Sequence, residues 1–157
     1  MNIDNTIENL KTDLVPAFYN SFESVDADNF FAVFKSRDLV ISRYFLALSY
    51  VQQDVILVDH IKAVRAEIKS KYRAIWCIRE IGLHIILFSN HSEINTQFID
   101  VKSDKIGNHA VILQGVHLVD TESNILFDNL SNWGVIKFGK GKKIDAILVG
   151  PEEQVTF

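Results

Sequence analysis

The chain has 157 residues, of which 48% are apolar and 23% charged, so it can bury a core of its own and lacks the composition of a disordered or collagen-like protein. A single cysteine excludes an intrachain disulfide and any metal site built from several cysteines. The net charge of -4 disfavours non-specific binding to nucleic acid.

Negative charge is concentrated near the N-terminus. Residues 1–34 carry Lys11 as their one basic side chain, against the acidic residues Asp4, Glu8, Asp13, Glu23, Asp26 and Asp28. The first residues lack the basic and apolar runs of a secretory signal. The longest apolar stretch, residues 83–88, is far shorter than the roughly 20 residues of a membrane span. Together with one unpaired thiol, these features predict a cytoplasmic protein that binds neither a membrane nor nucleic acid.

Apolar residues recur at helical spacing through residues 1–90, which predicts a mainly helical half. Asn5, followed three residues later by a glutamate, is a capping-box pattern and predicts the start of a first helix, which Pro16 ends or kinks. Two further short helices are predicted from Asp26 and, with Ser36 as its cap, from residue 36 onward.

The longest helical pattern begins at Asp54, and its apolar positions recur at intervals of three and four as far as Ile75. A break at Gly82 is predicted to turn residues 83–88 into a strand. A basic strip runs beside the apolar stripe and consists of Lys62, Arg65, Lys69 and Arg73. Such a strip can bind an acidic partner, although it is more often the solvated edge of a helix.

Residues 95–150 have short, β-branched apolar runs separated by turn residues, a pattern typical of an antiparallel sheet. Strands are predicted at 97–101, 110–119, 124–128, 135–138 and 144–149. Because helices come first and strands afterwards, the order predicts an α+β fold in which N-terminal helices pack on a C-terminal antiparallel sheet. We expect two layers, a single core and a single domain over residues 1–157. The sequence has no Gly-rich phosphate loop, so nothing in it favours nucleotide binding through one.

The sheet half contains one pattern typical of a catalytic histidine. In chain order it consists of Asn108-His109-Ala110-Val111, Gly115, Asp128-Asn129 and Trp133-Gly134. This order resembles the histidine region of papain-like cysteine peptidases and covers residues 108–134. The resemblance implies that His109 is the general base and that Asn129, or its neighbour Asp128, orients it. The nucleophile would then be the only cysteine, Cys77.

Cys77 lies in the apolar stretch 75–78 and precedes His109 by 32 residues, whereas the peptidases separate these residues by about 130–150. A thiol in apolar surroundings is a core side chain rather than a nucleophile. Histidines at 84, 91, 109 and 117 lack the spacing of a metal site. We therefore predict a non-catalytic protein- or ligand-binding module without cofactor or metal. A reduced papain-like cysteine hydrolase is the alternative.

Aromatic side chains crowd between residues 18 and 50 and are interleaved with the acidic cluster. A small domain has too little core to bury all of them, and surplus aromatic residues at a surface mark an interface or a ligand cleft. We therefore predict a recognition surface for another protein, with a homodimer as the favoured assembly. The predicted recognition surface consists of Tyr19, Phe22, Phe30, Phe31 and Phe34.

Overall fold

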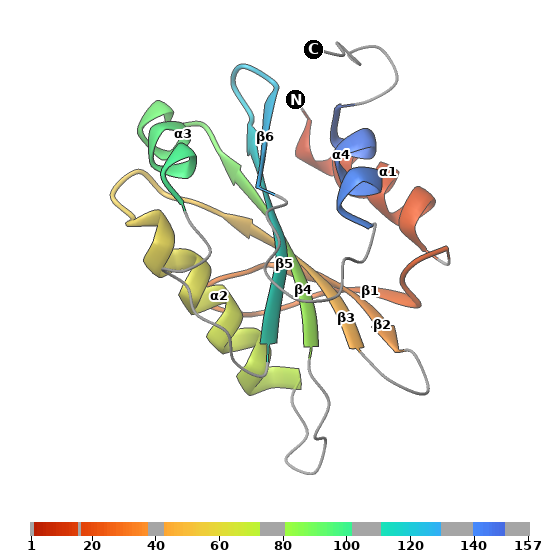
Figure 1. Cartoon of the computed structure of the whole chain (residues 1–157). Coiled ribbons are helices and arrows are strands. Elements are labelled where there is room, and N and C mark those ends of the chain that lie inside the picture. Colours follow the sequence, from red (N-terminus) through yellow and green to blue (C-terminus); the bar gives the residue numbers. More distant parts are fainter. Residues whose placement is uncertain are drawn as a thin grey trace.

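The computed structural model describes residues 2–15, 17–37, 43–72, 81–101, 111–129 and 140–149, and Figure 1 shows them as a sheet with helices on both faces. In chain order the elements are α1 (Ile3–Leu14), β1 (Ser21–Ser24), β2 (Ala32–Arg37), β3 (Arg43–Tyr50), α2 (Leu57–Tyr72), β4 (Ile81–Ser89), α3 (Ser92–Ile99), β5 (Val111–Asp120), β6 (Ile125–Asn129) and α4 (Lys140–Val149). The described strands form one sheet in the order β1-β2-β3-β4-β5-β6.

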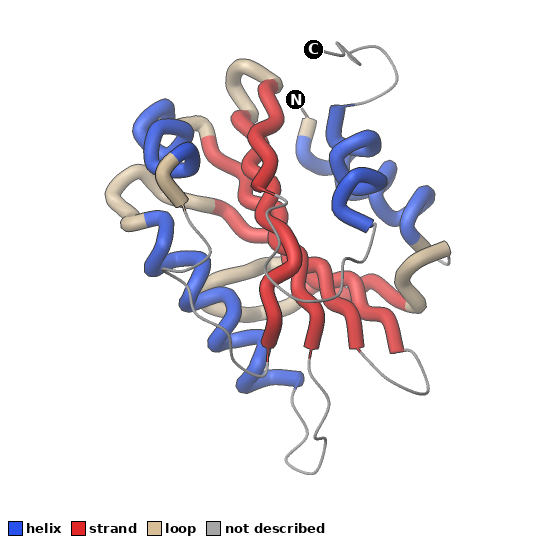
Figure 2. The backbone as a smooth tube through the Cα atoms, in the orientation of Figure 1, coloured by secondary structure: helices blue, strands red, loops and turns tan. Residues whose placement is uncertain are grey.

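The sheet is mixed. Strands β1, β2 and β3 form an antiparallel meander, β3, β4 and β5 are parallel, and β6 returns antiparallel to β5. The parallel pairs follow from the helices between them, because a chain can rejoin a sheet in the same direction only through a crossover connection. Helices α2 and α3 make these two crossovers and cover one face, whereas α1 and α4 cover the other (Figure 2).

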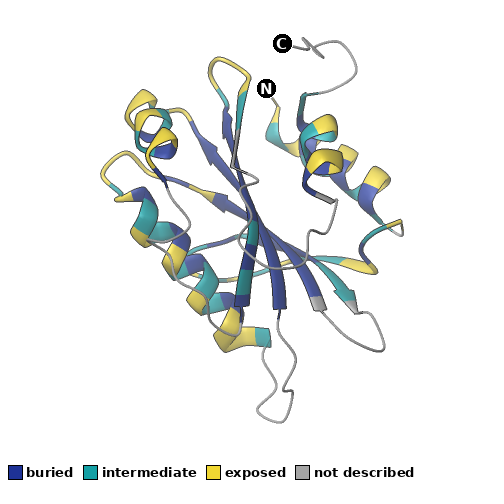
Figure 3. Ribbon diagram, viewed as in Figure 1, coloured by how far each residue is buried: buried dark blue, intermediate teal, exposed yellow. Residues whose placement is uncertain are grey.

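Strand β4 is buried along its whole length, and in Figure 3 it is one of the strands coloured dark blue. Its alternate side chains belong to two separate hydrophobic clusters. Leu83 and Ile85 pack with residues of α2 and α3, whereas Ile86 and Phe88 pack with residues of α1 and α4. A strand covered by helices on both faces has a continuous apolar sequence, which is what residues 81–89 have.

The α+β class predicted from the sequence is confirmed, but the predicted arrangement is wrong. The sheet is mixed instead of antiparallel, its strands begin at Ser21 instead of residue 97, and the described core has two clusters instead of one. The helices predicted from Asp26 and Ser36 are replaced by β2 and β3. The cause is the burial of these strands, because a continuous apolar run has no alternation to distinguish it from a buried helix. Aromatic and β-branched side chains then favour the strand.

Other elements match the sequence analysis in part. The long helix after Asp54 is confirmed as α2, and the strands predicted near 83–88, 110–119 and 124–128 are confirmed as β4, β5 and β6. The strands predicted at 97–101 and 144–149 are wrong. Residue 97 lies inside α3, which buries Ile94 and Phe98 four positions apart, and residues 144–149 belong to α4. The strand predicted at 135–138 lies outside the described residues.

A serine–histidine pair ties α2 to the centre of the sheet. The hydroxyl of Ser49, on β3, donates to the Asn29 carbonyl oxygen at 2.6 Å and lies 2.7 Å from Nε2 of His60, on α2. Since the one hydroxyl hydrogen is used on Asn29, the His60 ring is the donor in this pair. Burial lowers the pKa of His60 below its ordinary value of 6.5, because it disfavours the charged ring.

This lowered pKa makes the stability of the fold dependent on pH. The unfolded chain takes up the His60 proton before the folded chain does, so the free energy of unfolding should fall as pH falls through about 6.5. We expect His60→Gln, which keeps a donor near Ser49, to lose less stability than the native chain between about pH 7.5 and pH 5.5. Urea unfolding at the two pH values measures this difference. An equal loss of unfolding free energy in the native chain and in His60→Gln would contradict a lowered pKa of His60 in the folded protein.

Candidate functional site

Three parallel strands end side by side at one edge of the sheet. Tyr50, the last residue of β3, pairs in register with Phe88 of β4, and Ser89, the last residue of β4, pairs with Asp120 at the end of β5. In open α/β sheets this edge, beyond the carboxyl ends of parallel strands, is where ligands bind. The structure has a pocket at this place.

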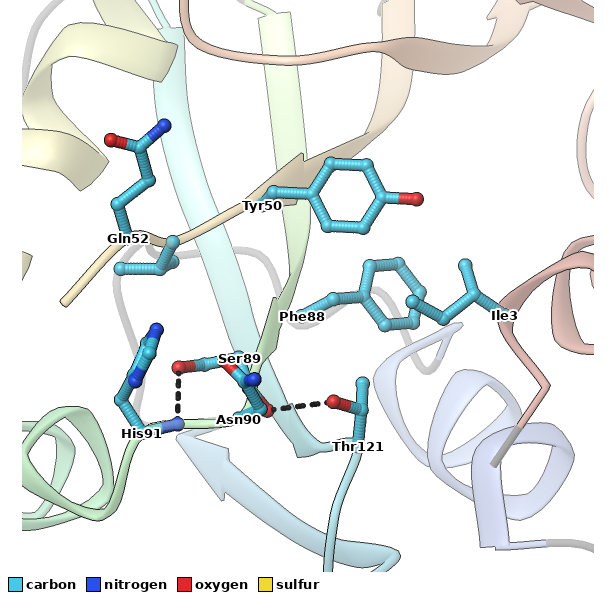
Figure 4. A pocket seen from close by; sticks show the side chains of 9 residues that line it. Ile3, Tyr50, Gln52, Phe88, Ser89, Asn90, His91 and Thr121 are labelled. Atoms are coloured by element: carbon cyan, nitrogen blue, oxygen red, sulfur yellow. Dashed lines mark hydrogen bonds between the residues drawn. The ribbon is translucent and has the colours of Figure 1, made fainter.

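The pocket has a volume of about 340 Å³, within the roughly 300–1,000 Å³ range of small-molecule sites. It collects side chains from α1, from the ends of β3 and β4, and from the turn after β5. Its lining residues are Ile3, Tyr50, Val51, Gln52, Phe88, Ser89, Asn90, His91 and Thr121. In Figure 4 the apolar Tyr50, Phe88 and Ile3 lie on one side, and Gln52 and His91 on the other.

Stacked aromatic rings form the apolar side of the pocket. The rings of Phe31 and Tyr50 have centroids 4.4 Å apart and an interplanar angle of 20°, and Phe88 is tilted against Tyr50 with its centroid 6.1 Å away. Tyr50 is nevertheless 52% exposed. Partial burial and the charge of Asp4 both raise the pKa of Tyr50, so its hydroxyl stays protonated at neutral pH. The pocket therefore offers a supported aromatic ring with much of its surface free.

Hydrogen bonds lock the polar side of the pocket. The backbone N–H and the hydroxyl of Thr121 donate to the carbonyl oxygen of Ser89, at 2.8 and 3.2 Å. The Ser89 hydroxyl, on a residue only 4% exposed, accepts the backbone N–H of His91 at 3.2 Å. These bonds join the ends of β4 and β5 to the start of α3, so the polar wall belongs to the rigid part of the fold.

The lining contains no Asp, Glu, Lys or Arg side chain. The nearby Asp120 carboxylate is occupied in the turn after β5, where it accepts from Asn95 Nδ2 at 2.8 Å and from the backbone N–H groups of Glu122 and Ser123 at 2.9 and 3.2 Å. Although burial opposes ionisation of Asp120, these bonds lower its pKa. The carboxylate is thus a structural element of the pocket's surroundings, and the lining itself carries no acidic side chain and no Lys or Arg.

A second polar group lies on the α1/α4 face of the sheet. His84 Nδ1, on β4, is 3.2 Å from His117 Nε2, on β5, and His117 Nδ1 is 2.6 Å from a carboxylate oxygen of Asp145, on α4. His84 and His117 are 2% and 0% exposed. Because a carboxylate only accepts, Nδ1 of His117 donates to Asp145. This series of hydrogen bonds connects α4 to the strands β4 and β5. None of its three residues lines the pocket.

The residues that the peptidase resemblance singles out are not brought together by anything described. Cys77 and His109 lie outside the described residues. Asp128 and Asn129 are the last two residues of β6 and pair in register with His117 and Val116, with their side chains outside what the structure describes. The hydrolase alternative therefore stays a prediction. In the described part of the chain, no group of three His, Cys, Asp or Glu side chains gathers as a metal site.

The predicted aromatic surface is largely core. Tyr19, Phe30 and Phe34 are 1%, 3% and 0% exposed and fill the two hydrophobic clusters. Phe22 is half-buried, with its ring centroid 4.8 Å from that of Phe34 and the Lys11 ammonium 4.4 Å above it. Phe31, also half-buried, supports Tyr50. The two hydrophobic clusters, one on each face of the sheet, bury more rings than the single core that the prediction assumed.

The predicted basic strip lies along α2. Lys62 and Lys69 are exposed, and Lys62 forms a loose ion pair with Asp59 at 3.8 Å. Arg65 is half-buried, and this burial lowers its pKa. Arg73 lies outside the described residues. Among the helices that the structure describes, none has the length and apolar character needed to cross a membrane.

The residues that line the pocket were not predicted from the sequence. A usable signal existed, because polar residues follow three apolar runs: Gln52 after β3, Ser89-Asn90-His91 after β4, and Thr121 after β5. That signal requires the runs to be parallel neighbouring strands, and β3 was predicted as a helix. Comparison with known proteins gave no match to a family model, a curated protein or a solved structure.

Proposed function

We propose that the chain is a non-catalytic binding module that holds a small molecule in the pocket at the carboxyl ends of β3, β4 and β5. The observation that carries this proposal is the pocket itself, with an aromatic wall at Tyr50 and Phe88 and a rigid polar wall at Ser89. Binding sites of small ligands combine an apolar lining with a few placed polar groups in this way.

The lining favours binding over catalysis. Its most buried hydroxyl, on Ser89, accepts a hydrogen bond from the backbone N–H of His91. A nucleophilic serine donates its proton to a base, and in the described part of the structure the partner of Ser89 Oγ is an N–H donor, which is not a base. The described contacts of Ser89 therefore support a ligand-binding role.

A thermal-shift panel tests the proposal with three probes of different chemistry: adenosine, methyl β-D-glucopyranoside and benzoate. At about ten times its Kd, a probe that binds the native fold should raise Tm by about 3–6 °C. We expect a rise with at least one probe, the same rise in Ile99→Ala, and a smaller one in Tyr50→Ala. Ile99 is an exposed control residue on α3. No rise with any of the three probes contradicts the proposal.

The homodimer stays part of the proposal, with a smaller aromatic surface. Phe22 and Phe31 are the members of the predicted set that still reach the surface, and the exposed Tyr50 stacks on Phe31. Sedimentation at micromolar concentration should show a dimer for the native chain and a monomer for Phe22→Asp, provided that this variant remains folded. A native monomer removes self-association.

The hydrolase alternative makes its own prediction about Cys77. An activated thiolate in the native protein reacts with iodoacetamide at mildly acidic pH, whereas a structural thiol does not. The proposal of a binding module expects native Cys77 to react more slowly than the same cysteine in the urea-unfolded chain. Faster reaction in the native protein would favour the hydrolase that uses Cys77, His109 and Asn129 or Asp128.

A further inference from the structure

Tyr50 presents a ring on which another flat ring can stack. Phe31 lies nearly parallel to it, with centroids 4.4 Å apart and an angle of 20°, so Phe31 holds the Tyr50 ring in place. Tyr50 remains 52% exposed and lines the pocket. A flat ligand ring on this exposed side would become the third layer of the stack. Stacking of a base on an aromatic side chain tolerates any flat heteroaromatic ring.

The polar lining residues offer hydrogen bonds to the edge of such a ring. Gln52 and Asn90 each carry a carboxamide, which supplies a donor and an acceptor together. Paired donors and acceptors of this kind match the ring nitrogens and exocyclic groups of a nucleobase. The oxygen of Ser89 accepts from the His91 N–H, so the Ser89 hydrogen can be donated to a ligand.

The charge of the lining and the volume of the pocket restrict the class of ligand further. The lining has no Lys or Arg that would bind a phosphate or carboxylate, and the charge of Asp4 acts on Tyr50 at the rim. An anion would therefore be disfavoured. The volume of about 340 Å³ is near the lower end of the range for small-molecule sites, which suits one ring system with a sugar better than a dinucleotide.

We infer that the ligand is an uncharged heteroaromatic molecule of the nucleoside type, with its ring stacked on Tyr50 and its edge bonded to the carboxamides of Gln52 and Asn90. This inference rests on the proposed function, since it assigns a chemical class to the ligand of the same pocket. It needs no Gly-rich loop, because a nucleoside has no phosphate to hold.

Calorimetric titration with adenosine tests the inference. For a ligand of this size we expect a Kd on the order of 100 μM. Tyr50→Ala should weaken binding about tenfold or more, whereas Tyr50→Phe, which keeps the stack on Phe31, should stay within about threefold. Gln52 is exposed, so the Gln52→Ala variant should remain folded. It should weaken adenosine binding by about three- to tenfold. Ile99→Ala should leave the Kd unchanged.

Two further ligands separate the possible outcomes. Adenosine 5′-monophosphate should bind more weakly than adenosine, and tighter binding of the nucleotide would overturn the assignment of an uncharged ligand. Adenosine binding that Tyr50→Ala and Gln52→Ala leave unchanged would overturn the stacking geometry. If adenosine fails while methyl β-D-glucopyranoside binds in a Tyr50-dependent manner, the ligand class is wrong and the proposed function survives. If none of the probes binds, both are wrong.

Discussion

Replacing either Ile85 or Ile86 with alanine should lower the free energy of unfolding by about 2–5 kcal/mol. These neighbours on β4 point to opposite faces of the sheet, and each is 0% exposed. Ile85 belongs to the cluster under α2 and α3, and Ile86 to the cluster under α1 and α4. Both truncations therefore leave a cavity in a packed core. Urea unfolding of the two variants measures the effect.

A suitable control is Ile125→Ala, because Ile125 lies on the outer strand β6 and is 50% exposed. We expect this variant to lose less than about 1 kcal/mol, since little apolar surface is returned to water. A fold with helices on one face only would make one of the two β4 substitutions as mild as the control. That outcome would contradict the arrangement of helices on both faces.

The second large effect is expected at Asp145. Removal of its carboxylate in Asp145→Ala takes away the 2.6 Å acceptor of His117 Nδ1, and the imidazole is fully buried. A buried polar group that loses its partner costs about 1–3 kcal/mol, or more when the bond involves a charge. The carboxylate also connects α4 to the sheet. We therefore expect both a loss of stability and faster amide hydrogen exchange in α4.

Asp145→Asn gives a matched comparison, because its amide oxygen still accepts from His117 without carrying a charge. It should lose less stability than Asp145→Ala. Lys142→Ala, at an exposed position of the same helix, should change neither the unfolding free energy nor the exchange rates by much. If Asp145→Ala behaves like Lys142→Ala, the His84–His117–Asp145 chain does not hold α4 in place.

Whether a segment's secondary structure could be predicted from the sequence depended on how that segment is buried. Helix α2 was predicted because its buried residues, including Ile61, Val64 and Ile68, form one stripe, and most of its other positions are polar. Strands β5 and β6 were predicted because the turn residues 120–123 separate them. The turn also includes Asn124, at a φ of 59°, which was predicted as the first strand residue. Strand β3 failed because its residues 44–49 are all buried, so neither face shows a polar alternation.

The error in β3 propagated to the candidate site. If residues 43–50 are predicted as a helix, no contact is predicted between Tyr50 or Gln52 and the distant residues Ser89 and Thr121. The pairing of Tyr50 with Phe88 is a long-range contact that periodicity does not encode. The number of aromatic residues near the N-terminus led to the prediction of an exposed aromatic surface. The second buried face of the sheet, which contains Tyr19 and Phe34, was not predicted.

The amide spectrum of the ¹⁵N-labelled chain, recorded during a titration with adenosine, tests most directly whether the pocket is the binding site. Ligand binding at the carboxyl ends of the parallel strands should shift the signals of residues 50–52, 89–91 and 121 first and most strongly, because these residues line the pocket. The signals along the basic strip of α2, at Lys62 and Lys69, should stay in place. Shifts confined to α2, or no shifts at all, would contradict the account.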